Sequence, residues 1–274
     1  MLQNIILLFM ILSLPLYMRG EEVCRIVSLS PAVTEIICHL GGEKYLAGRS
    51  SACNFPESVR KLPVAGDFAK PYMEKILLLR PRYLLTNDLI NPAAAKKFES
   101  VGIKCVMKQI DNAEDYFYWV EFTGKILKKE AAASLEIQRV KKFLAELAAK
   151  QTGKKLKALW IIWDSPIMIA GKNSLLHNAM EYAQCRNVAE NVKSDYFRAS
   201  AEWLAKSDPD LIIFPQLTEK KRQELSKKYP WNSMRAWKEG KIISRLPEDL
   251  LLRPGPRFFD GVDLLHKEIY TGKK

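Results

Sequence analysis

The chain has 274 residues, of which 48% are hydrophobic and 27% charged, which is ordinary for a folded protein of one large or two medium domains. Its formal net charge of +12 admits an anionic partner such as nucleic acid, a membrane surface or a small ligand. The lysines are spread along the chain, which favours a solvated surface and argues against a nucleic-acid-binding module with a concentrated basic face.

The first residues have the outline of an export signal. An apolar run over residues 5–17 is too short to span a bilayer comfortably, and Pro15 and Gly20 mark its end. This pattern predicts a signal peptide over residues 1–20 and a periplasmic or cell-surface location. Neither a Lys nor an Arg precedes the run and no A-x-A site closes it, so a retained N-terminal anchor is the alternative. The tripeptide before Cys24 does not fit a lipoprotein cleavage box, so we do not predict lipidation.

Export would place the cysteines in an oxidising compartment. Their number is odd, so at least one stays unpaired or pairs between chains: Cys24, Cys38, Cys53, Cys105 and Cys185. No C-x-x-C is present, which argues against a thiolate zinc site, and the three histidines are scattered, as surface or packed helical residues are. We therefore predict neither a metal site nor a resident cofactor.

Strand-like and helix-like segments alternate through the first part of the chain. A short apolar run over 25–30 precedes a helical pattern from Pro31 that ends at Gly41–Gly42, and strands and helices then follow at 44–50, 74–81, 82–86, 91–102 and 103–108. This alternation predicts a parallel sheet with covering helices.

Two helical segments then interrupt the alternation before it resumes. The first covers 114–127, and the second, 128–151, is long, lacks Pro and Gly, and ends before Gly153. Strands and helices are then expected over 157–163, 173–184, 201–208, 210–214, 218–229, 241–245 and 260–270. We predict an α/β fold with two lobes, residues 21–112 and 154–274, joined by a helical connector over 113–153 that includes one long backbone helix. A ligand cleft is expected between the lobes.

One sequence pattern occurs once in each predicted lobe. "EKILLLRP" and "EWLAKSDP" each begin with a Glu, Glu74 or Glu202, and each has a Pro seven positions later, Pro81 or Pro209. An apolar strand-like run follows in both cases.

Sequence motifs of the common enzyme classes are missing. The chain has no Gly-rich dinucleotide loop, no P-loop, no G-x-S-x-G elbow, no H-E-x-x-H and no local carboxylate pair of the kind glycosidases use. We therefore expect a binding protein and not an enzyme. A metal-dependent enzyme on the same two lobes is the remote alternative.

Several segments, in this order, resemble a known family: "RIVSLSPAVTEIICHLG", "SACNFP", "LPVAGDFAKPYMEKILLLRP", "IAGKNSLLHNAMEYAQCRNVAEN", "SAEWLAKSDPDLII" and "LLLRPGPRFFDGVDLL". From Arg25 to Tyr270 the chain is similar to the helical-backbone, metal-chelate class of periplasmic solute-binding proteins of ABC importers, and within it to the cobalamin-binding branch. The resemblance implies a monomeric receptor that captures cobalamin or another metal chelate and delivers it to a membrane permease dimer. Haem or a ferric siderophore is the alternative ligand within the class.

The resemblance also implies roles for particular residues. Glu74 and Glu202 would dock onto arginines of the permease, although each can instead stabilise only the start of its own helix. The ligand would meet the loops after the strands, at Cys53, Phe68, Trp163, Asp164, Tyr196, Asp249 and Arg253. The competing interpretations are a buried or disulfide-bonded Cys53, core positions for Phe68 and Trp163, and an Arg253 that ties down its own loop.

Two departures from the family pattern stand out. The first lobe reads "RPRYLL", with Arg82 where the family has an Asp, whereas the second lobe keeps "DPDLII". Ala52 stands in "SACNFP" where cobalamin binders can carry an aromatic residue, which leaves room for another chelate. The positive charge favours an anionic chelate in the same way.

Overall fold

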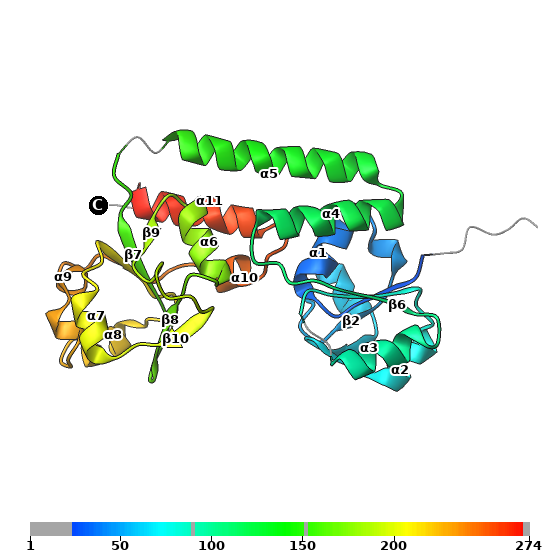
Figure 1. The fold of residues 1–274 in the computed structure, drawn as a ribbon, viewed down its shortest axis with the longest axis horizontal. Helices are drawn as coiled ribbons and strands as arrows, with labels where there is room; N and C mark the ends of the chain where they lie inside the picture. Colours follow the sequence, from blue (N-terminus) through cyan, green and yellow to red (C-terminus); the bar gives the residue numbers. More distant parts are fainter. Residues whose placement is uncertain (1–23, 89–90, 151–152, 271–274) are drawn as a thin grey trace, which may run out of the picture.

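The computed structural model describes residues 24–88, 91–150 and 153–270. The predicted signal peptide over 1–20, and with it the alternative of a retained anchor, lies outside these residues. Two α/β lobes lie side by side under a layer of long helices (Figure 1). The predicted fold class, two lobes with mostly parallel sheets and one long helix across them, is confirmed.

The first lobe holds a six-stranded sheet in the order β4-β3-β2-β1-β5-β6. Its strands are β1 (Ile26–Ser28), β2 (Leu46–Ser50), β3 (Val64–Asp67), β4 (Lys70–Pro71), β5 (Tyr83–Thr86) and β6 (Lys104–Met107), and only β4 is antiparallel to its neighbour. Its helices are α1 (Pro31–His39), α2 (Met73–Leu79) and α3 (Pro92–Glu99), with single 3₁₀ turns at Glu43–Tyr45 and Glu57–Lys61. The Oγ of Ser30 accepts from the amide of Val33 and Pro31 opens the first turn, so the sequence itself sets where α1 begins.

The second lobe holds a six-stranded sheet in the order β10-β8-β7-β11-β12, with β9 beside β7. The strands are β7 (Lys157–Asp164), β8 (Ile167–Ala170), β9 (Arg186–Asn187), β10 (Tyr196–Arg198), β11 (Leu211–Ile213) and β12 (Ile242–Ile243). The helices are α6 (Leu175–Tyr182), α7 (Ala201–Lys206), α8 (Glu219–Leu225), α9 (Arg235–Lys238) and α10 (Glu248–Leu251), with a 3₁₀ turn at Trp231–Ser233. The antiparallel pairs β7–β8 and β8–β10 were not expected from the sequence, because β8 and β10 are too short to show alternation.

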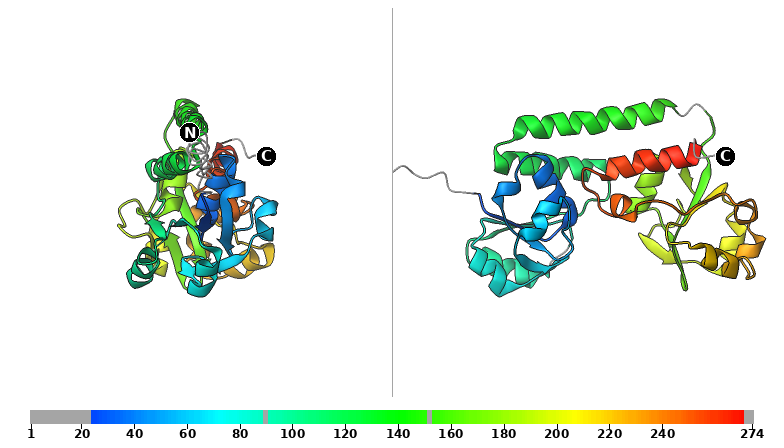
Figure 2. Two further views of the ribbon diagram at one scale, coloured as in Figure 1. Left: turned by 90° about the vertical axis from the view of Figure 1, so that its right-hand side faces the viewer. Right: turned by 180° about the vertical axis from the view of Figure 1, so that it is seen from behind.

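Three long helices join the lobes: α4 (Ala113–Leu127), α5 (Glu130–Lys150) and α11 (Phe258–Tyr270). Figures 1 and 2 show that α5 runs along one side of the molecule above α4 and α11. One continuous apolar cluster contains side chains of α1 and β1 from the first lobe, of the joining helices, and of β7 and α6 from the second lobe. The lobes are therefore held together by a shared core.

The duplicated sequence pattern has a duplicated backbone. A residue in the left-handed region lies at the C-cap of α2, Arg80 with φ +44°, and two residues after α7, Asp208 with φ +37°, and a proline follows each. A non-glycine residue in this region is uncommon. The match shows that the two segments are equivalent in geometry as well as in sequence.

A buried carboxylate ties α1 to the helical layer. The side chain of Glu136 on α5 is only 3% exposed and accepts from His39 Nε2 at 2.9 Å, Tyr116 Oη at 2.7 Å and Arg139 Nε at 2.7 Å. Burial alone raises the pKa of Glu136, but the hydrogen bonds from Arg139, His39 and Tyr116 outweigh it and lower the pKa from 4.5 to about 2.

This network predicts an acid-sensitive component of stability. Because the pKa of Glu136 is lowered on folding, the network stabilises the protein above about pH 4.5 and loses its effect as the pH falls toward 2. The loss is up to about 3 kcal/mol in the free energy of unfolding. Urea unfolding at a series of pH values is expected to show a flatter acid limb for Glu136→Gln, which is also less stable at pH 7. Glu146→Gln, on the exposed face of the same helix, is expected to keep the wild-type profile. An unchanged acid limb in Glu136→Gln would contradict the assignment.

Candidate functional site

Two exposed aromatic side chains follow strands of the first lobe. Phe68, 44% exposed, comes directly after β3, at the turn into β4 where Ala69 has φ +54°. The carboxylate of Asp67 accepts from Ser51 Oγ at 2.6 Å and Tyr72 Oη at 2.7 Å, which fixes this turn. Phe68 is therefore not a core residue. Phe55, 42% exposed, lies in the loop after β2 and was not singled out from the sequence.

Two further exposed aromatic side chains lie on the second lobe. Trp163 is 51% exposed and Tyr196 is 45% exposed. A β-bulge lies between Ile161 and Trp163 on β7, so Ile161 faces the cluster around Trp203 and Trp231 while Trp163 faces the opposite side of the sheet. That opposite side carries α6 and α10 and looks toward the first lobe (Figure 1).

The strand register identifies further side chains on the side of the sheet that carries Trp163, beyond those named from the sequence. Trp163 is paired with Met168 on β8, and Met168 is paired with Arg198 on β10, so these side chains point to the same side of the sheet. Phe197, between Tyr196 and Arg198, points the other way and packs on Trp203 with ring centroids 5.1 Å apart. Arg198 is exposed and has no hydrogen bond or ion pair within the described residues. We refer to Trp163, Met168 and Arg198 as the β7–β10 row.

Two residues predicted to contact the ligand point elsewhere. Asp164 follows Trp163 and faces the opposite side of the sheet, where its carboxylate lies 2.7 Å from Lys221 Nζ on α8. This carboxylate thus points away from the side of the sheet that carries Trp163, and its contact with the ligand stays a prediction. Cys53 has no exposed surface, and its Sγ lies 3.2 Å from Thr34 Oγ1 and 3.1 Å from Ser50 Oγ. Its side chain belongs to the interior, as the competing interpretation had it, so we remove it from the ligand surface.

Asp249 and Arg253 bind each other. The guanidinium of Arg253 lies 3.1 Å from the Asp249 carboxylate and donates to Asn54 Oδ1 of the first lobe at 2.5 Å. Four residues on, Arg257 makes two bonds to the buried carboxylate of Glu35, at 2.9 and 2.6 Å, and its guanidinium lies 3.6 Å from the Phe55 ring centroid. The segment 253–257 therefore connects the second lobe to the first through hydrogen bonds of its two arginines. The Asp249 side chain remains 61% exposed, so it keeps a free surface.

The two predicted docking glutamates are exposed on equivalent short helices. Glu74 on α2 has no hydrogen bond or ion pair among the described residues. The pKa of Glu202 on α7 is lowered, first by its own backbone amide and then by Ser200. Both side chains are exposed, so both carboxylates are accessible to a partner.

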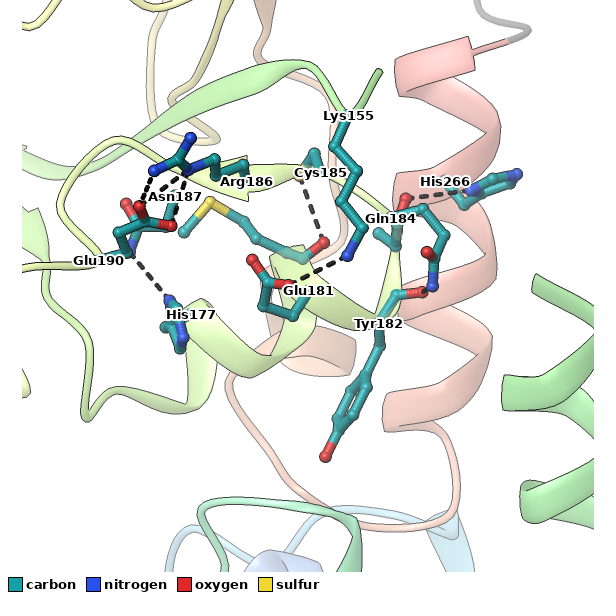
Figure 3. Close-up of polar contacts among 12 residues, drawn as sticks. Lys155, His177, Glu181, Tyr182, Gln184, Cys185, Arg186, Asn187, Glu190 and His266 are labelled. Atoms are coloured by element: carbon teal, nitrogen blue, oxygen red, sulfur yellow. Dashed lines mark hydrogen bonds and ion pairs between the residues drawn. The ribbon is translucent and has the colours of Figure 1, made fainter. Parts of the chain in front are cut away.

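Polar side chains gather around α6 and β9 (Figure 3). Arg186 pairs with Glu190, Lys155 Nζ lies 3.1 Å from Glu181, and Asn187 Nδ2 lies 3.4 Å from His177 Nδ1. His266 on α11 faces the carbonyl oxygen of Ala183 at 3.0 Å. In the described part of the chain, no three His, Cys, Asp or Glu side chains lie together as metal ligands would. This cluster fixes α6 against the sheet.

All five cysteines are free thiols. Burial raises the pKa of Cys38 to about 12 and that of Cys105 to about 11, with smaller contributions from nearby glutamates. At neutral pH these two thiols are protonated and therefore poor nucleophiles.

Known proteins resemble this chain along most of its length. The sequence model of the family described as periplasmic binding protein matches residues 26–249. An uncharacterised ABC transporter substrate-binding lipoprotein of Bacillus subtilis is 25% identical over 91% of this chain and 81% of its own. A vitamin B12-binding protein of Vibrio parahaemolyticus is 24% identical over 92% of this chain and 93% of its own. A periplasmic haem-binding protein of Pseudomonas aeruginosa has a similar fold, with a TM-score of 0.75 at 24% identity over 92% of this chain and 94% of its own. None of the helices among the described residues has both the length and the apolarity that a membrane span requires.

Proposed function

The chain belongs to the periplasmic binding protein family, and we propose that it is the extracytoplasmic receptor of an ABC importer for a flat metal chelate of the corrinoid type, such as cobalamin. The observation that carries this proposal is the set of exposed aromatic side chains on both lobes: Phe55, Phe68, Trp163 and Tyr196. Exposed aromatic rings are rigid apolar platforms that suit a flat macrocycle. In this proposal the receptor is a monomer, it catalyses no reaction, and it hands the ligand to a membrane permease dimer.

The relatives support the corrinoid type of ligand. The Vibrio relative is named for vitamin B12, and the Bacillus relative is named a substrate-binding lipoprotein of an ABC transporter. Asp249, whose carboxylate is largely exposed beside Arg253, supplies a polar group for amides at the edge of such a ligand.

A second candidate is a receptor for haem or a ferric chelate. It is favoured by Arg198, whose guanidinium has no partner in the described part of the chain and shares one side of the sheet with Trp163 and Met168. A guanidinium in this position is suited to a carboxylate at the edge of a porphyrin. The net charge of +12 also favours an anionic ligand.

The test is a titration of the purified chain with cyanocobalamin, haemin and a ferric hydroxamate siderophore, followed by absorbance and calorimetry. We expect one of the three to bind with a dissociation constant of about 1 μM or lower. Trp163→Ala is expected to weaken that binding about tenfold through the loss of ring contact. Tyr229→Ala, which removes an equally exposed ring elsewhere on the same lobe, is expected to leave it unchanged. If none of the three chelates binds, the proposed function is wrong.

Arg198→Gln separates the two candidates in the same titration. If the ligand carries carboxylates, the variant is expected to bind it about tenfold more weakly, because a charge-assisted hydrogen bond is lost. Binding of cyanocobalamin is expected to be unchanged by this substitution. Equal weakening of both ligands would indicate that Arg198 supports the shape of the surface and does not select for charge.

A further inference from the structure

The two equivalent helix ends carry opposite charges. Counting from Glu74 and Glu202, the residues in the left-handed position are Arg80 and Asp208, and two residues further on stand Arg82 and Asp210. Both positions share a positive φ, so the side chains at matching positions differ in charge while the chain turns in the same way.

In the second lobe the acidic pair is satisfied within the chain. Arg235 on α9 lies 3.3 Å from Asp208 and 3.1 Å from Asp210. The two aspartates at this end of α7 are therefore already paired with Arg235 and are not available to a partner.

In the first lobe two charged side chains of this region, Arg80 and Glu74, have no polar partner among the described residues. The guanidinium of Arg80 has no hydrogen bond or ion pair within the described residues, and neither has the carboxylate of Glu74. Arg25 donates from Nε to the carbonyl oxygen of Leu79 at 3.0 Å, and the described chain offers no partner to its two terminal nitrogens. Two guanidinium groups and one carboxylate around this short helix thus have no ion-pair partner among the residues that the structure describes.

Apolar side chains lie among these charges. Leu77 is 40% exposed and Leu78 is 82% exposed, and both lie on the same side of α2 as Glu74. These residues line an open hollow of about 830 Å³, whose lining is Arg25, Glu74 and residues 77–80. We call this surface the lobe-1 notch. The equivalents of Leu77 and Leu78 in the second lobe are Ala205 and Lys206, so α7 has no comparable apolar surface.

We propose that the lobe-1 notch binds a permease segment that presents an Asp or Glu carboxylate to Arg25 and Arg80, beside an apolar side chain that covers Leu78. This proposal rests on the proposed function as a transport receptor. At Glu74 the receptor supplies the negative charge of the contact, whereas at Arg25 and Arg80 it supplies the positive charge. Charge complementarity identifies the occupant: unpaired charges of both signs around an apolar centre match a protein surface that also carries both signs. An anionic lipid surface fits less well, because Glu74 would face it with a like charge.

The proposal has a consequence for the partner. The first lobe requires an acidic group in the partner and the second lobe does not, so the two ends of the receptor are distinguishable to the permease. Each lobe then has its own preferred contact, although the two docking helices share one backbone geometry.

Photo-crosslinking tests the occupant directly. A benzophenone amino acid at position 78 in the full chain, expressed in the native cells, is expected to crosslink to the transmembrane subunit of an ABC transporter. The crosslinked peptide, identified by mass spectrometry, is expected to contain an Asp or Glu. The same amino acid at Leu135, which is 67% exposed on α5, is the matched control and is expected to give no such crosslink. A crosslink from position 78 to lipid, to a different protein or to a peptide without an acidic residue would overturn the proposal.

Charge reversal tests the arginines. Arg25→Glu with Arg80→Glu is expected to lower uptake into cells that lack the native gene about tenfold or more, while affinity for the chelate stays unchanged. Lys96→Glu with Lys97→Glu, on the exposed side of α3, makes the same change in net charge and is expected to leave uptake unchanged. Equal uptake by both double variants would overturn the proposal, as would binding to phosphatidylglycerol vesicles that depends on Arg25 and Arg80. A chain that binds no chelate but still gives the crosslink would refute the proposed ligand and support the notch.

Discussion

Replacement of Arg257 by alanine is expected to lower the free energy of unfolding by about 3–5 kcal/mol. The carboxylate of Glu35 is 3% exposed and is held by two bonds from the Arg257 guanidinium, at 2.9 and 2.6 Å. Without that guanidinium, Glu35 is left as a buried charge without its counter-ion. The substitution also removes the cation from the face of Phe55. Denaturant unfolding at pH 7, followed by far-UV circular dichroism, measures the loss.

Two further variants make this measurement specific. Arg222→Ala removes an exposed guanidinium whose pair with Glu219 spans 3.9 Å, and it is expected to change stability by only about 0.5 kcal/mol or less. Glu35→Leu combined with Arg257→Leu removes both charges and is expected to recover a large part of the loss. If Arg257→Ala lowers the free energy of unfolding by less than Arg222→Ala does, the contacts of the segment 253–257 do not stabilise the protein.

Loss of both docking carboxylates is expected to abolish transport while ligand binding persists. Glu74→Ala with Glu202→Ala is expected to lower uptake about 100-fold or more, because each truncation leaves an arginine of the permease without its carboxylate. Neither side chain supports the fold: both are exposed, and Glu74 has no partner in the described part of the chain. The measurements are uptake by cells that lack the native gene and, separately, titration of the purified variant.

A matched pair of controls is available in the same lobes. Glu57 and Glu219 are exposed carboxylates, 80% and 70% at the side chain, one in each lobe and neither of them on α2 or α7. Glu57→Ala with Glu219→Ala removes the same charge and is expected to leave uptake unchanged. Weakened ligand binding or an altered circular dichroism spectrum in the Glu74 and Glu202 variant would contradict a docking role.

Much of the fold could be predicted because its main elements carry strong local signals. The helix α5 is a long run without Gly or Pro, and the parallel strands β5 and β11 are short apolar runs bounded by turn residues. The strands β4 and β10 escaped prediction because Lys70–Pro71 and Tyr196–Arg198 are not apolar runs, and β8 because only two residues separate it from β7. All three pair antiparallel with a neighbouring strand, and that pairing is what defines them.

The candidate site could be predicted less well, because its residues depend on side-chain direction. Trp163 and Asp164 are adjacent, so only one of them faces the first lobe, and the bulge after Ile161 decides which. The thiol of Cys53 lies next to exposed residues in sequence but is surrounded by hydroxyl groups brought together from α1 and β2. Arg198 was not singled out, although it stands two residues after Tyr196 and therefore on the same side of an extended strand.

The core shared by α1, α4, α5, α6 and α11 also affects the distance between the two docking helices. Because one apolar cluster runs through both lobes, buried packing holds together the lobes that carry α2 and α7. In the proposed function, the receptor then presents its two docking carboxylates at a set distance from each other. The matching arginines of the permease must lie at the same distance. Widening that spacing means breaking core contacts, so the mechanical work needed to open the receptor comes from the transporter. Substitutions deep in the helical layer would then alter transport without touching either the ligand or the partner.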